Sequence, residues 1–78
     1  LLIDQIINKY QYILEKFDKP KLSLHVHPFI KAYLTKGLFS VKRKWTIKYK
    51  HRLDVKSDTN LSFLDFEFID ESGDKEIV

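Results

Sequence analysis

Six basic side chains gather in the middle of the sequence, within the stretch SVKRKWTIKYKHR at residues 40–52, which contains no acid. These candidate RNA-phosphate-binding residues are Lys42, Arg43, Lys44, Lys48, Lys50 and Arg52. Lysine and arginine can neutralise phosphates, and Trp45 or Tyr49 could stack on an unpaired base. The alternative places both rings in the core, which does not conflict with phosphate contacts by the lysines. We expect Trp45 to be mostly buried.

The histidines offer a second chemistry. His25 and His27 are two apart on a predicted strand, so they would point the same way, and with His51 they could supply three imidazoles to a metal. No carboxylate or cysteine stands at a spacing that completes a recognised site, and His27 lies at a predicted helix start. Helix capping and partial burial therefore explain these residues more simply.

The carboxylates Asp65, Glu67 and Asp70 could hold Mg²⁺ for phosphoryl chemistry. Their alternation with apolar residues is also typical of any solvated strand face. The sequence has no G-x-x-x-x-G-K-[ST], no G-x-G-x-x-G and no nucleophile elbow, and its two glycines leave no phosphate-cradling loop. It does not indicate a self-contained enzyme, and we expect no catalytic residue, metal or cofactor within it.

The composition indicates one small domain over residues 1–78. The chain has no cysteine, so its core must come from aliphatic and aromatic side chains, without a disulfide or thiolate metal site. No apolar run approaches the roughly 20 residues needed to cross a membrane. The sequence begins without methionine, and we interpret it as a piece of a longer protein or as a processed product.

The net charge of +3 hides an asymmetry along the chain. Of the eleven acids, eight lie from Asp54 onward, and of the fourteen bases, eight fall between Lys31 and Arg52. The resulting positive face could attract a polyanion. Alternatively, the acidic end screens the basic segment within one self-complementary surface, and charge alone does not choose between these interpretations.

Hydrophobic spacing predicts the elements in the first half of the chain. Apolar residues recur at steps of three and four over residues 3–17, which predicts a helix. Residues 22–26 alternate as a short strand does. Pro28 suits the first position of a second helix, and Gly37 suits its end. The expected apolar face of that helix consists of Phe29, Ile30, Tyr33 and Leu34.

The second half is less clear. Residues 41–55 alternate like a long amphipathic strand, and periodicity alone slightly favours that interpretation. The same segment also fits a helix with a stripe at steps of three and four, formed by Leu38, Val41, Trp45 and Tyr49. Residues 61–69 are the clearest strand, with Leu64, Phe66 and Phe68 on one face. Residues 75–78 suit a short edge strand or a frayed end.

The run LSLHVHPFIKAYLTKGLFSVKRKWTIKYKHRLDV resembles the C-terminal part of ribonuclease E/G family proteins. The matching features are LLIDQI, VHPFIKAYLTKG, KRKWTIKYK, and LSFLDFEFID followed by an acidic turn that contains glycine. The resemblance covers nearly the whole chain and is greatest to the Bacteroidetes-type ribonuclease G, sometimes labelled cytoplasmic axial filament protein. VHPFIKAYLTKG with KRKW is its distinctive part.

The resemblance implies a fold and a setting. The fold is α+β, a small sheet covered by helices in the order α-β-α-α-β-β, with a helix at residues 40–49 and a strand at 52–56. Relatives commonly have glycine near position 50 as a helix stop, where this chain has Lys50. The setting is the small domain that follows a Cys-x-x-Cys zinc link in a cytoplasmic endoribonuclease.

The resemblance also implies the partners of the parent protein. Structural Zn and catalytic Mg²⁺ would be bound upstream, and no catalytic position falls within this chain. RNA is the expected partner, the parent is an expected homo-oligomer, and in relatives the small domain contributes mainly to subunit assembly. An added RNA affinity of this domain is a further expectation. Two other interpretations remain open: a stand-alone basic module that binds RNA or the ribosome, and a purely structural protein-interaction domain.

Overall fold

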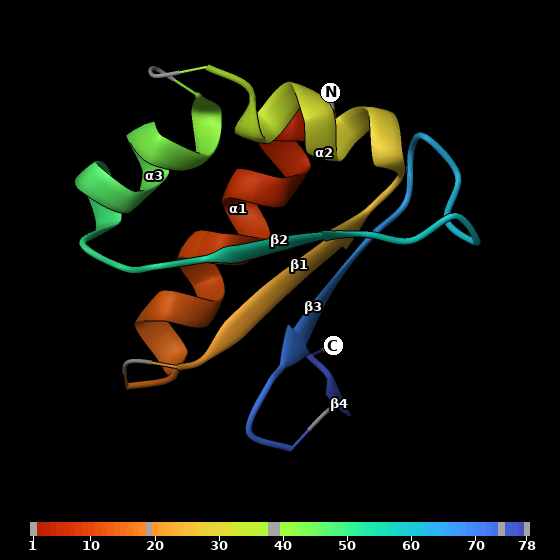
Figure 1. Ribbon diagram of the computed structural model, residues 1–78. Coiled ribbons are helices and arrows are strands. Elements are labelled where there is room, and N and C mark those ends of the chain that lie inside the picture. Colours follow the sequence, from red (N-terminus) through yellow and green to blue (C-terminus); the bar gives the residue numbers. More distant parts are fainter. Residues whose placement is uncertain (1, 19, 38–39, 74, 78) are drawn as a thin grey trace.

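The computed structural model describes residues 2–18, 20–37, 40–73 and 75–77. Its elements in chain order are α1 (Leu2–Lys16), β1 (Leu22–Val26), α2 (Pro28–Thr35), α3 (Val41–Tyr49), β2 (Asp54–Ser57), β3 (Phe66–Asp70) and β4 (Lys75–Glu76) (Figure 1). This confirms the predicted α+β order α-β-α-α-β-β. The short strand β4 follows where an edge strand or frayed end was expected, and Val78 lies outside the described residues.

β1 is a central strand of a mixed sheet with the order β2-β1-β3-β4. It pairs in parallel with β2 and antiparallel with β3, so Leu24 lies opposite both Val55 and Phe68. Because side chains alternate along a strand, these three residues share one face of the sheet, whereas Ser23 and His25 point to the other. The helix pair α2–α3 makes the crossover that a parallel pair requires.

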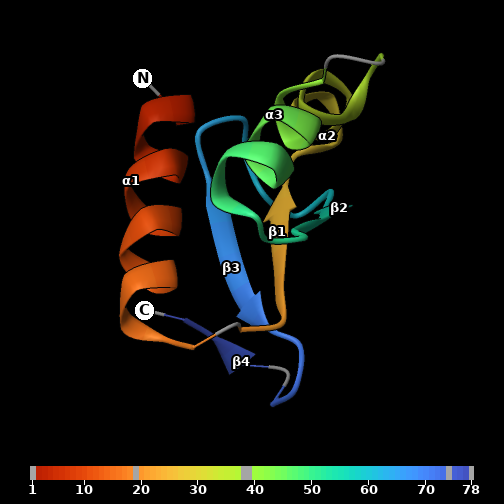
Figure 2. The same ribbon diagram turned by 90° about the vertical axis from the view of Figure 1, so that its left-hand side faces the viewer.

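All three helices contribute to one hydrophobic core on the face that carries Leu24. α1 lies along this side of the sheet (Figure 2) and completely buries Ile6, Tyr10 and Ile13. This confirms the predicted apolar stripe of the first helix, except that Phe17 just beyond its end is 44% exposed. The buried hydrophobic residues are Ile6, Tyr10, Ile13, Leu22, Leu24, Val26, Leu34, Trp45, Leu53, Val55 and Phe68.

α3 is capped at both ends. The Ser40 hydroxyl accepts a hydrogen bond from the Arg43 amide at 3.2 Å, as a helix N-cap does. At the other end, Lys50 adopts the left-handed conformation with a φ of 51°, where glycine is usual. The helix predicted at residues 40–49 is thus confirmed over the strand interpretation, and β2 begins at Asp54 rather than at the predicted Arg52.

The buried side of α3 also agrees with the helical stripe. Trp45 is only 5% exposed, and Val41 and Tyr49 are partly buried against the core. The expected burial of Trp45 is therefore confirmed. Leu38, the first residue of the predicted stripe, lies outside the described residues.

Only two of the four residues that were predicted to form the apolar face of α2 pack against the core. Leu34 is fully buried and Ile30 packs against the core, but Phe29 and Tyr33 are 67% and 63% exposed. Neighbouring residues on an α-helix differ by about 100° in direction, since a turn contains roughly 3.6 residues. A short helix that rests on the sheet by one stripe can therefore bury only one of these two pairs. The predicted end at Gly37 fits its φ of 87°.

The predicted strand at residues 61–69 is also too long, because β3 begins at Phe66. Phe66 lies opposite Val26, the last residue of β1, so the antiparallel ladder has no partner strand beyond it. The preceding residues form a turn in which the Ser62 hydroxyl donates to Asp65 Oδ2 at 2.9 Å. Leu64 is consequently 75% exposed and does not share a face with the core residues of β3.

Candidate nucleic-acid interface

The six candidate bases do not form one uniform surface. Lys42, Arg43 and Arg52 converge on a cleft of about 580 Å³ between the end of α2, the outer side of α3 and the loop before β2. We call it the α3 cleft, and it is lined by Thr35, Gly37, Ser40, Lys42, Arg43, Thr46, Ile47 and Arg52. Lys44 and Lys48 are exposed outside this lining, and Lys50 borders a separate pocket beside Tyr49.

Burial of Trp45 explains which bases reach the α3 cleft. With Trp45 facing the core, the helical period turns Arg43 and Ile47 away from the sheet and places Lys42 and Thr46 beside them. Lys44 and Lys48 then fall on the opposite flank of the helix. Arg52 joins the cleft only because the left-handed turn at Lys50 reverses the chain direction after α3.

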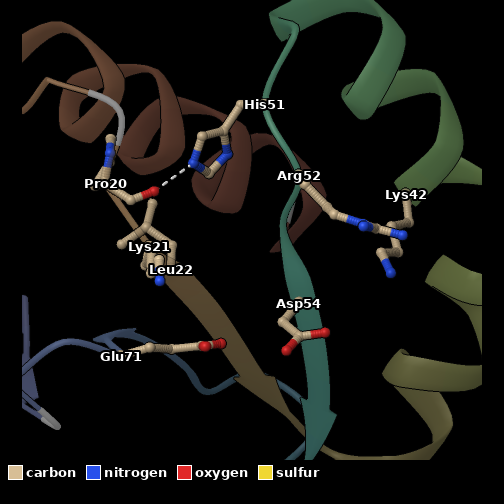
Figure 3. Close-up of a pocket in the computed structure, with 8 residues that line it drawn as sticks. All are labelled: Pro20, Lys21, Leu22, Lys42, His51, Arg52, Asp54 and Glu71. Carbon is tan, nitrogen blue, oxygen red and sulfur yellow. Dashed lines mark hydrogen bonds between the residues drawn. The ribbon is translucent and has the colours of Figure 1, made fainter.

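A second pocket of about 550 Å³ shares Lys42 and Arg52 with the α3 cleft (Figure 3). It is lined by Pro20, Lys21, Leu22, Lys42, His51, Arg52, Asp54 and Glu71. The two carboxylates, Asp54 and Glu71, offset much of its positive charge. One interpretation of the charge asymmetry was that later acids screen the basic segment. That interpretation fits this pocket, but it does not apply to the lining of the α3 cleft, which contains no acid.

The electrostatics of the α3 cleft are uniformly positive. The sequence contains no acid between Asp18 and Asp54, so neither α2 nor α3 carries a carboxylate. Within the described part of the chain, none of the six candidate bases forms an ion pair with a carboxylate. These cations therefore remain available to an external anion, although Asp54 and Glu71 in the neighbouring pocket lower the positive potential around Lys42 and Arg52.

The groups that line the α3 cleft differ in what they can donate. The hydroxyls of Thr35 and Thr46 donate to backbone carbonyls of their own helices, at 2.8 and 3.0 Å. The Ser40 hydroxyl accepts from a backbone amide, so its own proton remains available to a ligand. Together with the ammonium and guanidinium groups, it can donate to phosphate oxygens, but nothing in this arrangement reads a base.

His51 is held by two protein partners. Its Nε2 lies 2.6 Å from the Pro20 carbonyl oxygen, which can only accept, so Nε2 carries the proton in the neutral ring. Nδ1 then accepts a hydrogen bond from the Tyr10 hydroxyl at 2.7 Å. Burial, aided by the nearby Tyr49, raises the pKa of Tyr10, which keeps this hydroxyl protonated as the donor.

The three histidines are not brought together. His25 Nε2 lies 3.1 Å from the Ser23 hydroxyl on the sheet face away from the core. His27 has left the strand, and its Nδ1 accepts from the Phe29 amide at 3.2 Å as the N-cap of α2. The expectation that His25 and His27 lie on one strand is therefore wrong, whereas the capping role is confirmed for His27.

The three carboxylates considered for Mg²⁺ have separate partners or positions. Asp65 accepts from the Ser62 hydroxyl within its loop, and Glu67 lies on the sheet face opposite the core, beside His25. Asp70 Oδ1 accepts from the hydroxyl and amide of Ser72 at 2.6 and 3.0 Å, and these bonds lower its pKa. Among the described residues, no three histidine, aspartate or glutamate side chains are grouped so that they could hold a metal ion.

The aromatic residues differ most from the sequence-based expectation for a stacking site. Trp45 is buried, whereas Tyr49 is partly buried and its hydroxyl accepts from Gln11 Nε2 at 3.0 Å. The exposed aromatic residues lie elsewhere, with Phe29, Tyr33 and Phe63 around α2 and with Tyr12 and Phe17 at α1. Sequence reasoning assigned the first two to the core and placed Phe63 in a strand.

No family model, curated protein or solved structure matches this chain. None of the described helices has the length and apolar character needed to span a membrane.

Proposed function

We propose that this chain is a non-catalytic small domain of a cytoplasmic endoribonuclease of the ribonuclease E/G type, and that it holds single-stranded RNA by its phosphates. The observation that carries the RNA-holding role is the convergence of Lys42, Arg43 and Arg52 on an acid-free cleft. The resemblance of VHPFIKAYLTKG and KRKW supports the parentage. It assigns Mg²⁺-dependent cleavage of RNA and a structural Zn site to other parts of the parent.

The α3 cleft would bind the sugar–phosphate backbone without selecting a sequence. Arg43 and Arg52 are exposed and can each offer two parallel donors to a phosphate, while Lys42 supplies a point charge between them. The first amides of α3 add a partial positive charge at the same end. Lys44, Lys48 and Lys50 then act mainly through the general field that attracts a polyanion.

A salt titration with two matched variants tests this proposal. One variant changes Lys42, Arg43 and Arg52 to glutamine, and the other changes Lys44, Lys48 and Lys50 to glutamine, so both lose three charges. Binding of short single-stranded RNAs of different sequence is followed by fluorescence anisotropy over a range of salt concentrations. Each phosphate contact that is lost should reduce the salt slope by roughly 0.7 for single strands.

The cleft variant should lose affinity uniformly across RNA sequences and lose most of the salt slope, whereas the flank variant should lose less of both. Equal losses of RNA affinity in the two variants would show that binding depends on the total charge of the domain and not on the position of the bases in the α3 cleft. Unchanged affinity in both variants would contradict RNA binding through these six bases. Circular dichroism of each variant checks that the fold persists, because exposed substitutions usually change stability by only about 0.5 kcal/mol.

The absence of catalysis is a separate part of the proposal. The purified domain should not cleave RNA in the presence of Mg²⁺, since its carboxylates have separate local partners. Cleavage that disappears in an Asp65→Asn variant would contradict this part.

Subunit assembly is a second candidate function, supported by exposed apolar side chains away from the α3 cleft. Tyr12 on α1 is 48% exposed, and Phe17 just beyond α1 is also largely exposed. Apolar docking has a shallow salt dependence, unlike phosphate binding. Sedimentation equilibrium of the wild type and of a Tyr12→Ser, Phe17→Ser variant would test it, and a monomer at all concentrations would contradict self-association through this surface.

A further inference from the structure

A cluster of three rings lies at the end of α2 opposite the α3 cleft. The rings of His27 and Phe63 stack with centroids 4.4 Å apart and planes 22° apart, and Phe29 lies 5.3 and 5.5 Å from them. Phe63 comes from the loop between β2 and β3, so the cluster joins segments that are distant in the sequence. These contacts fix the rings in place, yet Phe63 is 48% exposed and Phe29 more so.

Tyr33 extends this surface along α2. It follows Phe29 by four residues, which puts the two side chains on the same face of the helix about 5–6 Å apart. The core contacts of α2 come from Ile30 and Leu34 instead. The α2 aromatic face, defined here as Phe29, Tyr33 and Phe63, is therefore held in a fixed arrangement without serving the core.

The charges around the α2 aromatic face suit a polyanion that carries flat apolar groups. α2 has no acid, and it bears Lys31 with Lys36 as its C-cap. In the neighbouring loop, Asp58 Oδ1 accepts from an amide at 2.9 Å, and Asp65 is bonded to its own loop. These carboxylates would repel a phosphate from the loop, so a backbone would run along α2 away from that loop.

The α2 aromatic face is also within reach of the α3 cleft. α2 advances roughly 1.5 Å per residue, so Phe29 and Thr35 are separated by about 9 Å along its axis. A stacked strand advances about 3.4 Å per nucleotide, so this distance corresponds to about three nucleotides. This axial distance is a lower bound, because at about 100° per residue Thr35 points roughly 120° away from Phe29 around the helix. A strand that also passes around α2 could join phosphates in the cleft to bases on the rings.

We infer that Phe29, Tyr33 and Phe63 form a stacking surface for unpaired bases of a single-stranded RNA whose phosphates occupy the α3 cleft. This inference rests on the proposed function. Aromatic rings accept any base because every base has a π face, so the stacking adds affinity with little sequence selection. Binding of bases in addition to phosphates would distinguish single-stranded RNA from other polyanions.

A second copy of the chain fits this surface less well. An aromatic side chain contributes about 150–250 Å² when fully buried, so the exposed parts of the three rings supply roughly 400 Å² at most. A specific interface needs about 800 Å² from each partner.

The experiment compares an oligoadenylate with an abasic oligomer of the same length, which has the same phosphates but no bases. Phe29 and Tyr33 are both changed to leucine, which keeps apolar surface but removes the flat ring. Tyr12→Leu is the control, because Tyr12 is an exposed aromatic residue on α1. Tyr33→Leu alone repeats the test with a residue outside the His27–Phe63 stack. Affinities are measured by anisotropy over a range of salt concentrations.

The wild type should prefer oligoadenylate to the abasic oligomer by roughly 5- to 150-fold for each stacked base. The double leucine variant, which retains Phe63, should lose most of that preference while it keeps its abasic affinity and salt slope, and Tyr33→Leu should lose a smaller part of it. Equal wild-type affinity for both oligomers, or an unchanged preference in the leucine variants, would overturn the stacking surface alone. A concentration-dependent dimer that only the double variant lacks would also overturn it. Failure to bind the abasic oligomer would instead contradict the proposed function.

Discussion

Replacement of Tyr10 by phenylalanine removes one hydroxyl from the core while it keeps the ring. The Tyr10 ring is fully buried and lies 5.2 to 6.0 Å from the rings of Trp45, Tyr49, His51 and Phe68. Those contacts should persist in the variant, but His51 Nδ1 loses the donor that it has at 2.7 Å. An unpaired, part-buried acceptor costs about 1–3 kcal/mol. For a domain of this size, each kcal/mol lowers the Tm by about 4–8 °C.

The pH dependence of this loss identifies the hydroxyl as its cause. Burial raises the pKa of Tyr10 above the ordinary tyrosine value of roughly 10. Above that pH the unfolded chain loses the Tyr10 proton while the folded chain keeps it, which stabilises the unfolded state. The contribution of the hydroxyl is therefore complete below pH 10 or so and declines above it by roughly 1.4 kcal/mol per pH unit. Tyr10→Phe has no such decline, so its deficit should vanish at about pH 11–12.

Urea unfolding of both proteins, followed by circular dichroism at a series of pH values, measures the difference directly. Tyr12→Phe is the matched control, because the Tyr12 hydroxyl is exposed and bonded only to Lys16 Nζ at 3.1 Å among the described residues. It should show little loss of stability near neutral pH, because an exposed hydroxyl can bond to water instead. A Tyr10→Phe deficit that stays constant up to high pH would refute the shielding of the hydroxyl, and no deficit near neutral pH would refute a stabilising bond to His51.

Three further changes test other parts of the fold by chemical denaturation. Trp45→Ala should cost roughly 3–5 kcal/mol, as large-to-small changes in cores do; near-wild-type stability with weaker RNA binding would restore Trp45 as a stacking residue. Lys50→Gly should stabilise the domain by up to about 1 kcal/mol, because Lys50 has a positive φ; a lower Tm would contradict strain at this cap. Asp70→Asn should destabilise near neutral pH, since hydrogen bonds lower the Asp70 pKa and favour the ionised fold. That deficit should close as the pH falls below roughly 3.9, and a deficit independent of pH would exclude the charge as its cause.

The segment at residues 41–55 shows why periodicity alone misjudged α3. Val41, Trp45 and Tyr49 are four residues apart, and a step of four satisfies both a helical stripe and the two-residue alternation of a strand. The intervening Ile47 distinguishes the two, since it would share the strand face with Trp45 but is 69% exposed on the helix. Whether Ile47 is buried depends on how the segment packs in the folded domain, which the periodicity of the sequence does not reveal. Only the family resemblance favoured a helix here.

The candidate site was partly predictable for a similar reason. Composition identified all six bases, but their division between the α3 cleft and the opposite flank depends on the rotation of α3 and on the turn at Lys50. The exposure of Phe29 and Tyr33 could not be predicted from the sequence, because α2 buries one stripe and the sequence offers two apolar pairs for it. A local signal did exist for Phe63: Ser62 and Asp65 are spaced to close a turn through side-chain hydrogen bonds, which compete with a strand.

The central position of β1 has a consequence for how the protein is made. Both of its neighbours, β2 and β3, come later in the chain than β1 itself. During synthesis, α1 and β1 emerge with Leu24 and the buried isoleucines of α1 before Val55 and Phe68 are available to cover them. The core can therefore close only after residue 68 has left the ribosome, and until then the nascent segment presents an apolar helix and an unpaired strand to its surroundings.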